Sequence, residues 1–293
     1  MDTLSRLVVY AALAFLFGSP AVGQQTRPAA PESGLTLSTD STEPVRFMAV
    51  HGRRAAIFGY PKNGLEMWAW PFQILDGYRI GIRPRDSTSE FDGNLLLRRI
   101  DYSPDAVTRI YIGPDFVVRE RLFVPLDQPG AIITYKVEGR GKVDILLHFT
   151  PVLDLMWPAS IGGQSTAWNE ALSGYVISDA AAGFTATIAS RDAVTHDNTE
   201  NSAIRYGDGL AFTIRPNPSA QVFIALNRVG GRGALVNQWV ADAPALEQQA
   251  AAHYADLARN GLQIETPEQD VNRAITWSEI ALDQAEVCNP DLG

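Results

Sequence analysis

Val143–Phe149 reads VDILLHF, and its odd-numbered positions are all apolar while Asp144 and His148 lie opposite them. This period of two predicts a β-strand whose apolar face packs against a second sheet. Further short strands separated by turn residues are predicted at Arg53–Tyr60, Leu65–Trp70, Tyr78–Arg83, Thr108–Ile112, Phe116–Val124 and Ala131–Val137. Since no crossover helices separate them, we expect a mainly β fold, a large antiparallel β-sandwich.

The apolar period changes near residue 240 from that of strands to that of helices. Asp242 is predicted to cap a first helix, which ends at Gly261 in the left-handed conformation. Thr266 and Gln269 have the spacing of a capping box and predict the start of a second helix. The apolar stripe of that second helix is broad and includes Val271, Ala274, Ile275, Trp277, Ala281 and Leu282.

A stripe of that width needs neighbours on more than one side of the helix. We therefore expect a truncated chain, in which the second helix is the first helix of a helical domain. The alternative is a complete protein that lays this helix back on the sandwich.

The first 23 residues have the pattern of a secretory signal peptide, with Arg6 before an apolar run and small residues before the cleavage point at Gly23. Residues 24–44 are rich in Pro, Ser and Thr, which predicts a flexible leader. The apolar run is shorter than the roughly 20 residues that a membrane-spanning helix needs. We expect an exported protein, periplasmic or extracellular, with no membrane partner after signal cleavage.

Charge and metal-binding residues limit the function classes. The formal net charge of -9 gives no support for binding nucleic-acid phosphate. Cys288 is the single cysteine, so no intramolecular disulfide forms, and the 4 histidines lack metal-ligand spacing. We expect no cofactor, no metal and a neutral or weakly polar ligand.

Four stretches, in this order, resemble the N-terminal part of bacterial six-hairpin glycosidases related to glycogen-debranching amylo-α-1,6-glucosidases. They are GLEMWAWPFQILDGYRIGI (64–82), VVRERLFVPLDQPGAIITYKV (117–137), LDLMWPASIGGQSTAWNE (153–170) and IETPEQDVNRAITWSEIALDQAEVCNPDLG (264–293). The resemblance implies a β-supersandwich, a linker helix and an (α/α)6 barrel. The implied organisation is a signal peptide (1–23), a leader (24–44), a β-sandwich domain (45–240), a linker helix (241–261) and a truncated helical domain (262–293).

The resemblance also implies an absence of catalysis in this chain. In the family the acid and base carboxylates lie in the barrel, beyond the last residue, and glycoside hydrolysis needs that pair across the scissile bond. We expect a non-catalytic region that packs on the missing barrel domain of a parent glycoside hydrolase and lines one side of its cleft. The implied substrate of the parent is an α-glucan or an oligosaccharide.

Trp157, Trp168, Asp154 and Asn169 are the candidate carbohydrate contacts, with Glu170 beside them. Indole rings stack on the apolar faces of sugars, and neighbouring carboxylates and amides bond to hydroxyl groups. The alternative for both tryptophans is packing in the core or against the missing barrel, and the residue types favour that alternative.

Trp68 and Trp70 lie two apart on a predicted strand and so share a face, which is more typical of sheet core or an interdomain contact than of a binding platform. Arg119, Glu120 and Arg121 alternate in charge, which predicts cross-strand ion pairs on a solvated face.

Two rival functions remain open from the sequence. One is a stand-alone carbohydrate-binding module that uses Trp157 and Trp168. The other is a mutarotase-like sugar epimerase with His148 as a general base, because neutral imidazole titrates near working pH.

Overall fold

The structure is a computed structural model of the 293-residue chain, which divides into two units, Met1–Glu32 and Ser33–Gly293. It describes residues 34–40, 42–43, 46–155, 164–179, 183–197, 209–228, 231 and 233–289. The predicted signal peptide and Trp157 lie outside the described residues.

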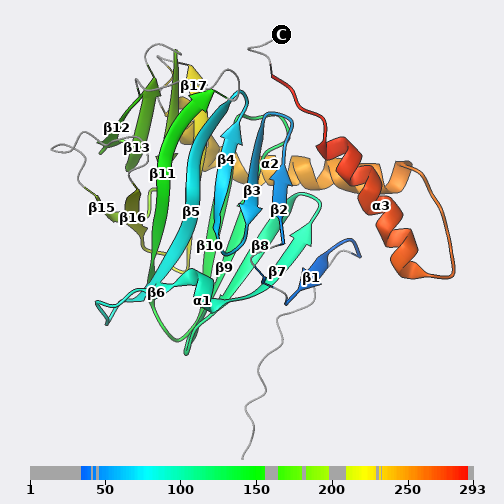
Figure 1. The fold of residues 1–293 in the computed structure, drawn as a ribbon, viewed down its shortest axis with the longest axis horizontal. Coiled ribbons are helices and arrows are strands. Elements are labelled where there is room, and N and C mark those ends of the chain that lie inside the picture. The colour runs from blue at the N-terminus through cyan, green and yellow to red at the C-terminus, as the bar shows by residue number, and fades with distance from the viewer. Residues whose placement is uncertain are drawn as a thin grey trace, which may run out of the picture. The chain divides into compact units, whose positions relative to one another are not determined.

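The described residues form two antiparallel sheets, one of nine strands and one of eight (Figure 1). The nine-stranded sheet runs, in spatial order, through β1 (Leu37–Thr39), β7 (Leu97–Ser103), β8 (Ala106–Ile112), β9 (Phe116–Phe123), β10 (Gly130–Gly139), β17 (Ser219–Arg228), β14 (Phe184–Ala189), β13 (Gly174–Asp179) and β12 (Gln164–Asn169). The eight-stranded sheet runs through β15 (Ala193–His196), β16 (Leu210–Ile214), β11 (Val143–Leu155), β5 (Phe72–Pro84), β4 (Gly64–Ala69), β3 (Ala55–Tyr60) and β2 (Met48–His51), with β6 (Phe91–Asp92) paired to β5.

The main hydrophobic core lies between the two sheets. The odd-numbered residues of the Val143–Phe149 stretch all belong to it, as the period of two predicts. Each of the other predicted strands is present within a few residues of its expected ends, although Tyr78–Arg83 is the second half of the longer strand β5. The predicted fold class, an antiparallel β-sandwich followed by two helices, is confirmed.

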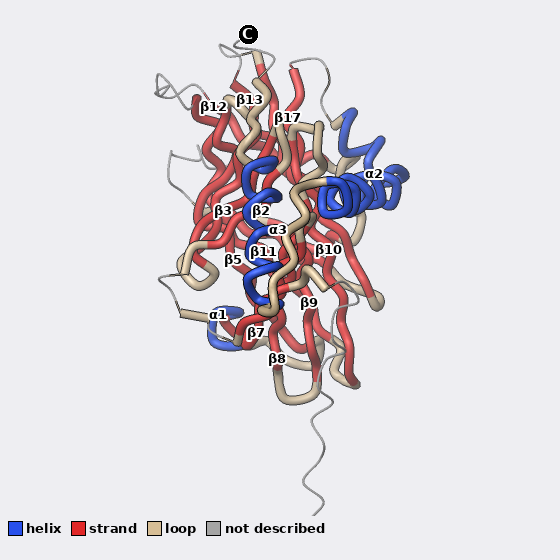
Figure 2. Tube along the Cα trace, turned by 90° about the vertical axis from the view of Figure 1, so that its right-hand side faces the viewer, coloured by secondary structure: helices blue, strands red, loops and turns tan. Residues whose placement is uncertain are grey.

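Helix α2 (Ala234–Asn260) covers the outer face of the nine-stranded sheet (Figures 1 and 2). Its residues Val236, Trp239 and Ala243 belong to a second hydrophobic core with Phe123 and Phe223 of the sheet. Burial of Trp239, which is 1% exposed, favours helical structure upstream of the predicted start.

The predicted end of this helix at Asn260 and Gly261 is confirmed, whereas its predicted start and the predicted conformation of Gly261 were wrong. Asp242 lies inside the helix and does not cap it, and Pro244 lies in the helix interior. Gly261 has an extended conformation (φ -72°), and its N–H bonds to the carbonyl of Leu257 at 2.8 Å without a left-handed residue.

A short helix, α1 (Gly93–Leu96), precedes β7, and the last helix is α3 (Gln269–Gln284). Helix α3 stands beside the sandwich (Figure 2). The predicted capping box does not form, because Thr266 bonds to Asn272: the Thr266 N–H donates to Asn272 Oδ1 at 2.8 Å, and Asn272 Nδ2 donates to the Thr266 carbonyl at 3.0 Å.

The apolar stripe of α3 is only partly covered. Ile280 is fully buried. Trp277 is half-buried, and its indole N–H donates a hydrogen bond to the Leu35 carbonyl at 2.9 Å. In contrast, Leu282 is 76% exposed and Val271 is 42% exposed. The helix thus rests on the sandwich by one side and leaves the predicted apolar surface bare on the other.

The predicted flexible leader contains a strand. Leu37–Thr39 forms β1 and pairs with Ile100–Tyr102 of β7. Backbone pairing with an existing sheet does not need large apolar side chains, so the polar composition of this segment did not indicate it.

Candidate functional site

Five aromatic side chains cross the outer face of the eight-stranded sheet. Successive ring centroids lie 5.8 Å apart for Tyr60 and Phe47, 6.0 Å for Phe47 and Phe58, 6.2 Å for Phe58 and Trp68, and 5.9 Å for Trp68 and Trp70. We call these five residues the aromatic row. Phe47 and Tyr60 are exposed, whereas the other three are half-buried.

The row arises because side chains alternate between the two faces of the sheet along β4. Leu65, Met67 and Ala69 point into the core. The residues between them must then point outward. Trp68 and Trp70 do share a face, as predicted, but that face is the outer one, so the core alternative was wrong for both.

Polar groups accompany the row. Glu66 Oε2 accepts a hydrogen bond from Trp68 Nε1 at 2.9 Å and one from Gln73 Nε2 at 3.3 Å. Gln73 is in register with Trp68 on one side and with Asp154 of β11 on the other. The side chains of residues paired across neighbouring strands point to the same face of a sheet. The predicted candidate Asp154 therefore lies next to Gln73, on the same face as the row.

Trp168 packs at a different place, against the core. Its ring stacks on His196 with a centroid distance of 4.0 Å and an interplanar angle of 9°, and it meets Tyr175 edge-on at 5.0 Å. Asn169 Oδ1 accepts from the Leu172 N–H at 3.1 Å and so stabilises the turn after β12.

The predicted sugar contacts are therefore divided between the sheets. Trp168 and Asn169 lie on β12 of the nine-stranded sheet, Asp154 lies on β11 of the eight-stranded sheet, and Trp157 is outside the described residues. The packing of Trp168 agrees with the alternative that the residue types favour, while its contact with a ligand stays a prediction.

His148 lies on the outward face of β11, as predicted, and its Nε2 lies 2.8 Å from Glu90 Oε1. The same Glu90 side chain covers Gly81, where an added Cβ would lie 1.7 Å from Glu90 Oε1. Glu90, in the segment that follows β5, thus covers Gly81 and bonds to the imidazole that an epimerase would use.

Glu120 is the largest departure from the predicted arrangement. It does not face solvent but is fully buried between the sheets. Its carboxylate accepts from Arg109 Nε at 2.5 Å, Tyr78 Oη at 2.6 Å, Tyr111 Oη at 2.8 Å and Tyr135 Oη at 3.1 Å. The sequence does carry a signal for this position, because Glu120 is in phase with the inward residues Phe116, Val118 and Leu122.

Burial sets the protonation of this buried cluster. It raises the pKa of Tyr78, Tyr111 and Tyr135 well above the usual value, so all three hydroxyls stay protonated and can donate. Burial alone would lower the pKa of Arg109, but the charge of Glu120 more than offsets this and keeps the guanidinium charged. The cluster fixes the two sheets together and is closed to ligands.

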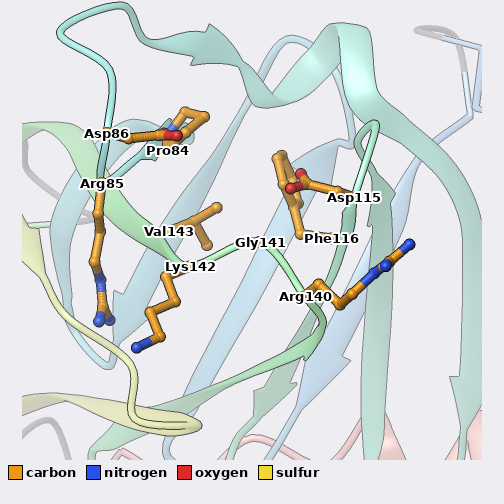
Figure 3. Close-up of a pocket in the computed structure, with 9 residues that line it drawn as sticks. All are labelled: Pro84, Arg85, Asp86, Asp115, Phe116, Arg140, Gly141, Lys142 and Val143. Atoms are coloured by element: carbon orange, nitrogen blue, oxygen red, sulfur yellow. The ribbon is translucent and has the colours of Figure 1, made fainter.

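A hollow of about 420 Å³ opens at the turn between β10 and β11 and includes Asp115, Phe116 and Val143 in its lining. Figure 3 shows the side chains of Arg85 and Lys142 pointing in one direction and that of Arg140 extending away on the other side. None of the predicted candidates lines this hollow.

Arg85, one of the three basic residues that line this hollow, belongs to a cluster of arginines around Asp144. Asp144 lies 2.9 Å from Arg215, 3.1 Å from Arg85 and 3.7 Å from Arg83. Burial would raise the pKa of Asp144, but hydrogen bonds and charge from Arg215 and Arg85 overcome this and hold it below the usual value.

Within the described ranges, no group of three or more His, Cys, Asp or Glu side chains is placed to hold a metal ion. In the same ranges, none of the helices has the length and apolar character that crossing a membrane requires.

No protein-family model and no curated protein matches the chain. Among solved structures, it is similar to a bacterial glucoamylase complexed with acarbose, with a TM-score of 0.59 and 7% identity over 81% of this chain. It also matches a putative kojibiose phosphorylase from the human microbiome, with a TM-score of 0.47, 10% identity and 81% of this chain covered. A family 81 glycoside hydrolase from Clostridium thermocellum matches with a TM-score of 0.34 and 12% identity over 65% of this chain.

The chain spans 40% of the glucoamylase chain, 39% of the phosphorylase chain and 24% of the family 81 chain. At these identities the similarity to the glucoamylase shows the fold alone. The chain therefore has a β-sandwich fold of the kind found in glycoside hydrolases, followed by two helices.

Proposed function

We propose that this chain is the non-catalytic β-sandwich region of an exported glycoside hydrolase that acts on an α-glucan or an oligosaccharide. In this proposal, α3 begins a helical catalytic domain of the debranching type, and the sandwich packs on that domain. The observation that carries the proposal is the bare stripe of α3, where Leu282 is 76% exposed.

The surroundings of the stripe support a helical partner. A hollow of about 410 Å³ runs along the same helix between Leu37, Ala274, Trp277 and Ala281. Contiguous apolar surface of this kind marks an interaction site more often than a solvated face. Small residues beside a tryptophan let another helix approach closely, as helix packing requires.

Catalysis is assigned to the partner domain in this proposal because three carboxylates of the described residues are already engaged by other protein groups. A glycosidase needs two carboxyl groups about 5 to 9.5 Å apart across the scissile bond. Glu120 is enclosed in the core, Asp144 is held by arginines, and Glu90 is bonded to His148. Trp168, Asp154, Asn169 and Trp157 remain proposed contacts to the sugar.

The test combines an activity assay with a surface probe. The purified chain should release no glucose from maltooligosaccharides, and it should bind the dye ANS at α3, with weaker dye binding in the Leu282→Ser variant. The product of the complete natural reading frame should hydrolyse the sugars and lose the ANS signal. Hydrolysis by the chain alone, or a reading frame without helical repeats after codon 293, would overturn the proposal.

A further inference from the structure

We propose that the aromatic row is a binding platform for a linear neutral oligosaccharide. The row is distinct from the Trp168 region and from the bare face of α3. The choice of sugar as the ligand class rests on the proposed function, whereas the position of the site rests on the geometry of the row.

The spacing of the rings suits a chain of sugars. Four successive centroid distances fall between 5.8 and 6.2 Å. The planes of Phe47, Phe58, Trp68 and Trp70 differ by 14° to 34° from one ring to the next, whereas Tyr60 meets Phe47 edge-on at 81°. The distance from one ring to the next is comparable with the length of one pyranose unit. The C–H faces of sugars pack on aromatic side chains, and a row of rings offers several such contacts to one chain.

Glu66 and Gln73 lie beside Trp68 and provide groups that can bond to the hydroxyls of a sugar. The bonds from Trp68 and Gln73 both use Glu66 Oε2, and Oε1 of the same carboxylate has no hydrogen bond to the described residues. The bond from Glu66 also fixes the Trp68 indole, so the ring is positioned before a ligand arrives. Preorganised groups of this kind reduce the ordering cost of binding.

A protein partner fits this face less well. Aromatic side chains are enriched at protein interfaces, but the centres of those interfaces are depleted in carboxylates, and Glu66 bonds to Trp68 within the row. The apolar surface that suits a helical partner is instead on α3, which stands beside the sandwich (Figure 1). Glu90 bonds to His148 on another part of the same sheet face, whereas Phe47 and Tyr60 of the row are 58% and 42% exposed.

The proposal is tested by isothermal titration of the signal-free chain with three probes: maltoheptaose, cellopentaose and laminaripentaose. At least one should bind at a single site with a Kd between micromolar and millimolar. Phe47→Ala and Trp68→Ala should each weaken that binding tenfold or more. Phe47 is 58% exposed, so its replacement leaves the fold intact and keeps the test valid if the Trp68 variant misfolds.

Phe91→Ala is the matched control, because Phe91 is an equally simple exposed phenylalanine, 41% exposed, outside the row. It should bind like the unaltered chain. Absence of binding by all three probes at 10 mM, undiminished binding in Phe47→Ala, or an equal loss in Phe91→Ala would each overturn the site. None of these outcomes affects ANS binding at α3. A negative result for sugar binding at the row is therefore distinguishable from a negative result for the proposed function.

Discussion

Glu120→Gln should destabilise the sandwich more than any surface substitution of the same kind. The change keeps the size of the side chain but leaves the Arg109 guanidinium buried without its counter-ion, since Arg109 Nε lies 2.5 Å from Glu120. Removing one partner of a buried ion pair costs about 3–5 kcal/mol. The amide has one oxygen, which can replace Oε1 for Tyr78 and Tyr135 or Oε2 for Arg109 and Tyr111 but not both, so we expect a loss near the upper end of that range.

A loss of this size is large against a total stability of about 5–15 kcal/mol. It should lower the midpoint of urea unfolding, followed by circular dichroism, by roughly 1–2 M. Glu138→Gln is the control, because Glu138 pairs with Arg119 and Lys136 at the surface and should lose less than about 1 kcal/mol. Adding Arg109→Met to Glu120→Gln removes the uncompensated charge and should restore part of the loss.

A loss below about 1 kcal/mol in Glu120→Gln, a value within the range of exposed pairs, would show that the buried ion pair contributes little to stability. A double variant less stable than the single one would show that the buried charge is not the cause of the loss.

Three further predictions concern the same sandwich. Trp239→Ala should cost about 3–5 kcal/mol, because the ring is fully buried under α2, and a thermal-melt shift within the error of the measurement would contradict this. The contribution of the buried tyrosines to the free energy of unfolding should be complete below about pH 10. Above that pH the free energy of unfolding should fall by up to about 4 kcal/mol per pH unit, because Tyr78, Tyr111 and Tyr135 ionise only after unfolding. Urea titrations at pH 9 and 11 measure the slope. Asp144 has a lowered pKa, so its contribution is present above about pH 4 and is lost as the pH falls; Asp144→Asn should therefore be less stable than the unaltered chain at pH 7 and nearly equal to it at pH 2.

The sequence predicted the strands well because alternation of apolar residues is a local signal, and most of the core follows it. The prediction for Glu120 was wrong because it relied on the alternating charges of residues 119–121. The inward and outward alternation of side chains along β9 would have placed Glu120 inside. The predicted start of α2 was wrong because Trp239 is helical through contact with a sheet distant in the chain. The aromatic row could be predicted only in part. Trp68 and Trp70 lie two apart at the end of β4, but Phe47 and Phe58 join them through pairing between strands.

The placement of α3 has a consequence for the solubility of the sandwich. Trp277 of α3 donates a hydrogen bond to the Leu35 carbonyl, just before β1. After the helix, the Cys288 N–H donates to the carbonyl of Arg53, just after β2. β1 and β2 are the last strands of their sheets, and such strands carry unpaired N–H and C=O groups that recruit other chains. The contacts of α3 and of the segment after it tie down the chain next to both edges, so a recombinant chain that stops before Gln269 should expose these strands more and form more oligomers than the unaltered chain, as size-exclusion chromatography would measure.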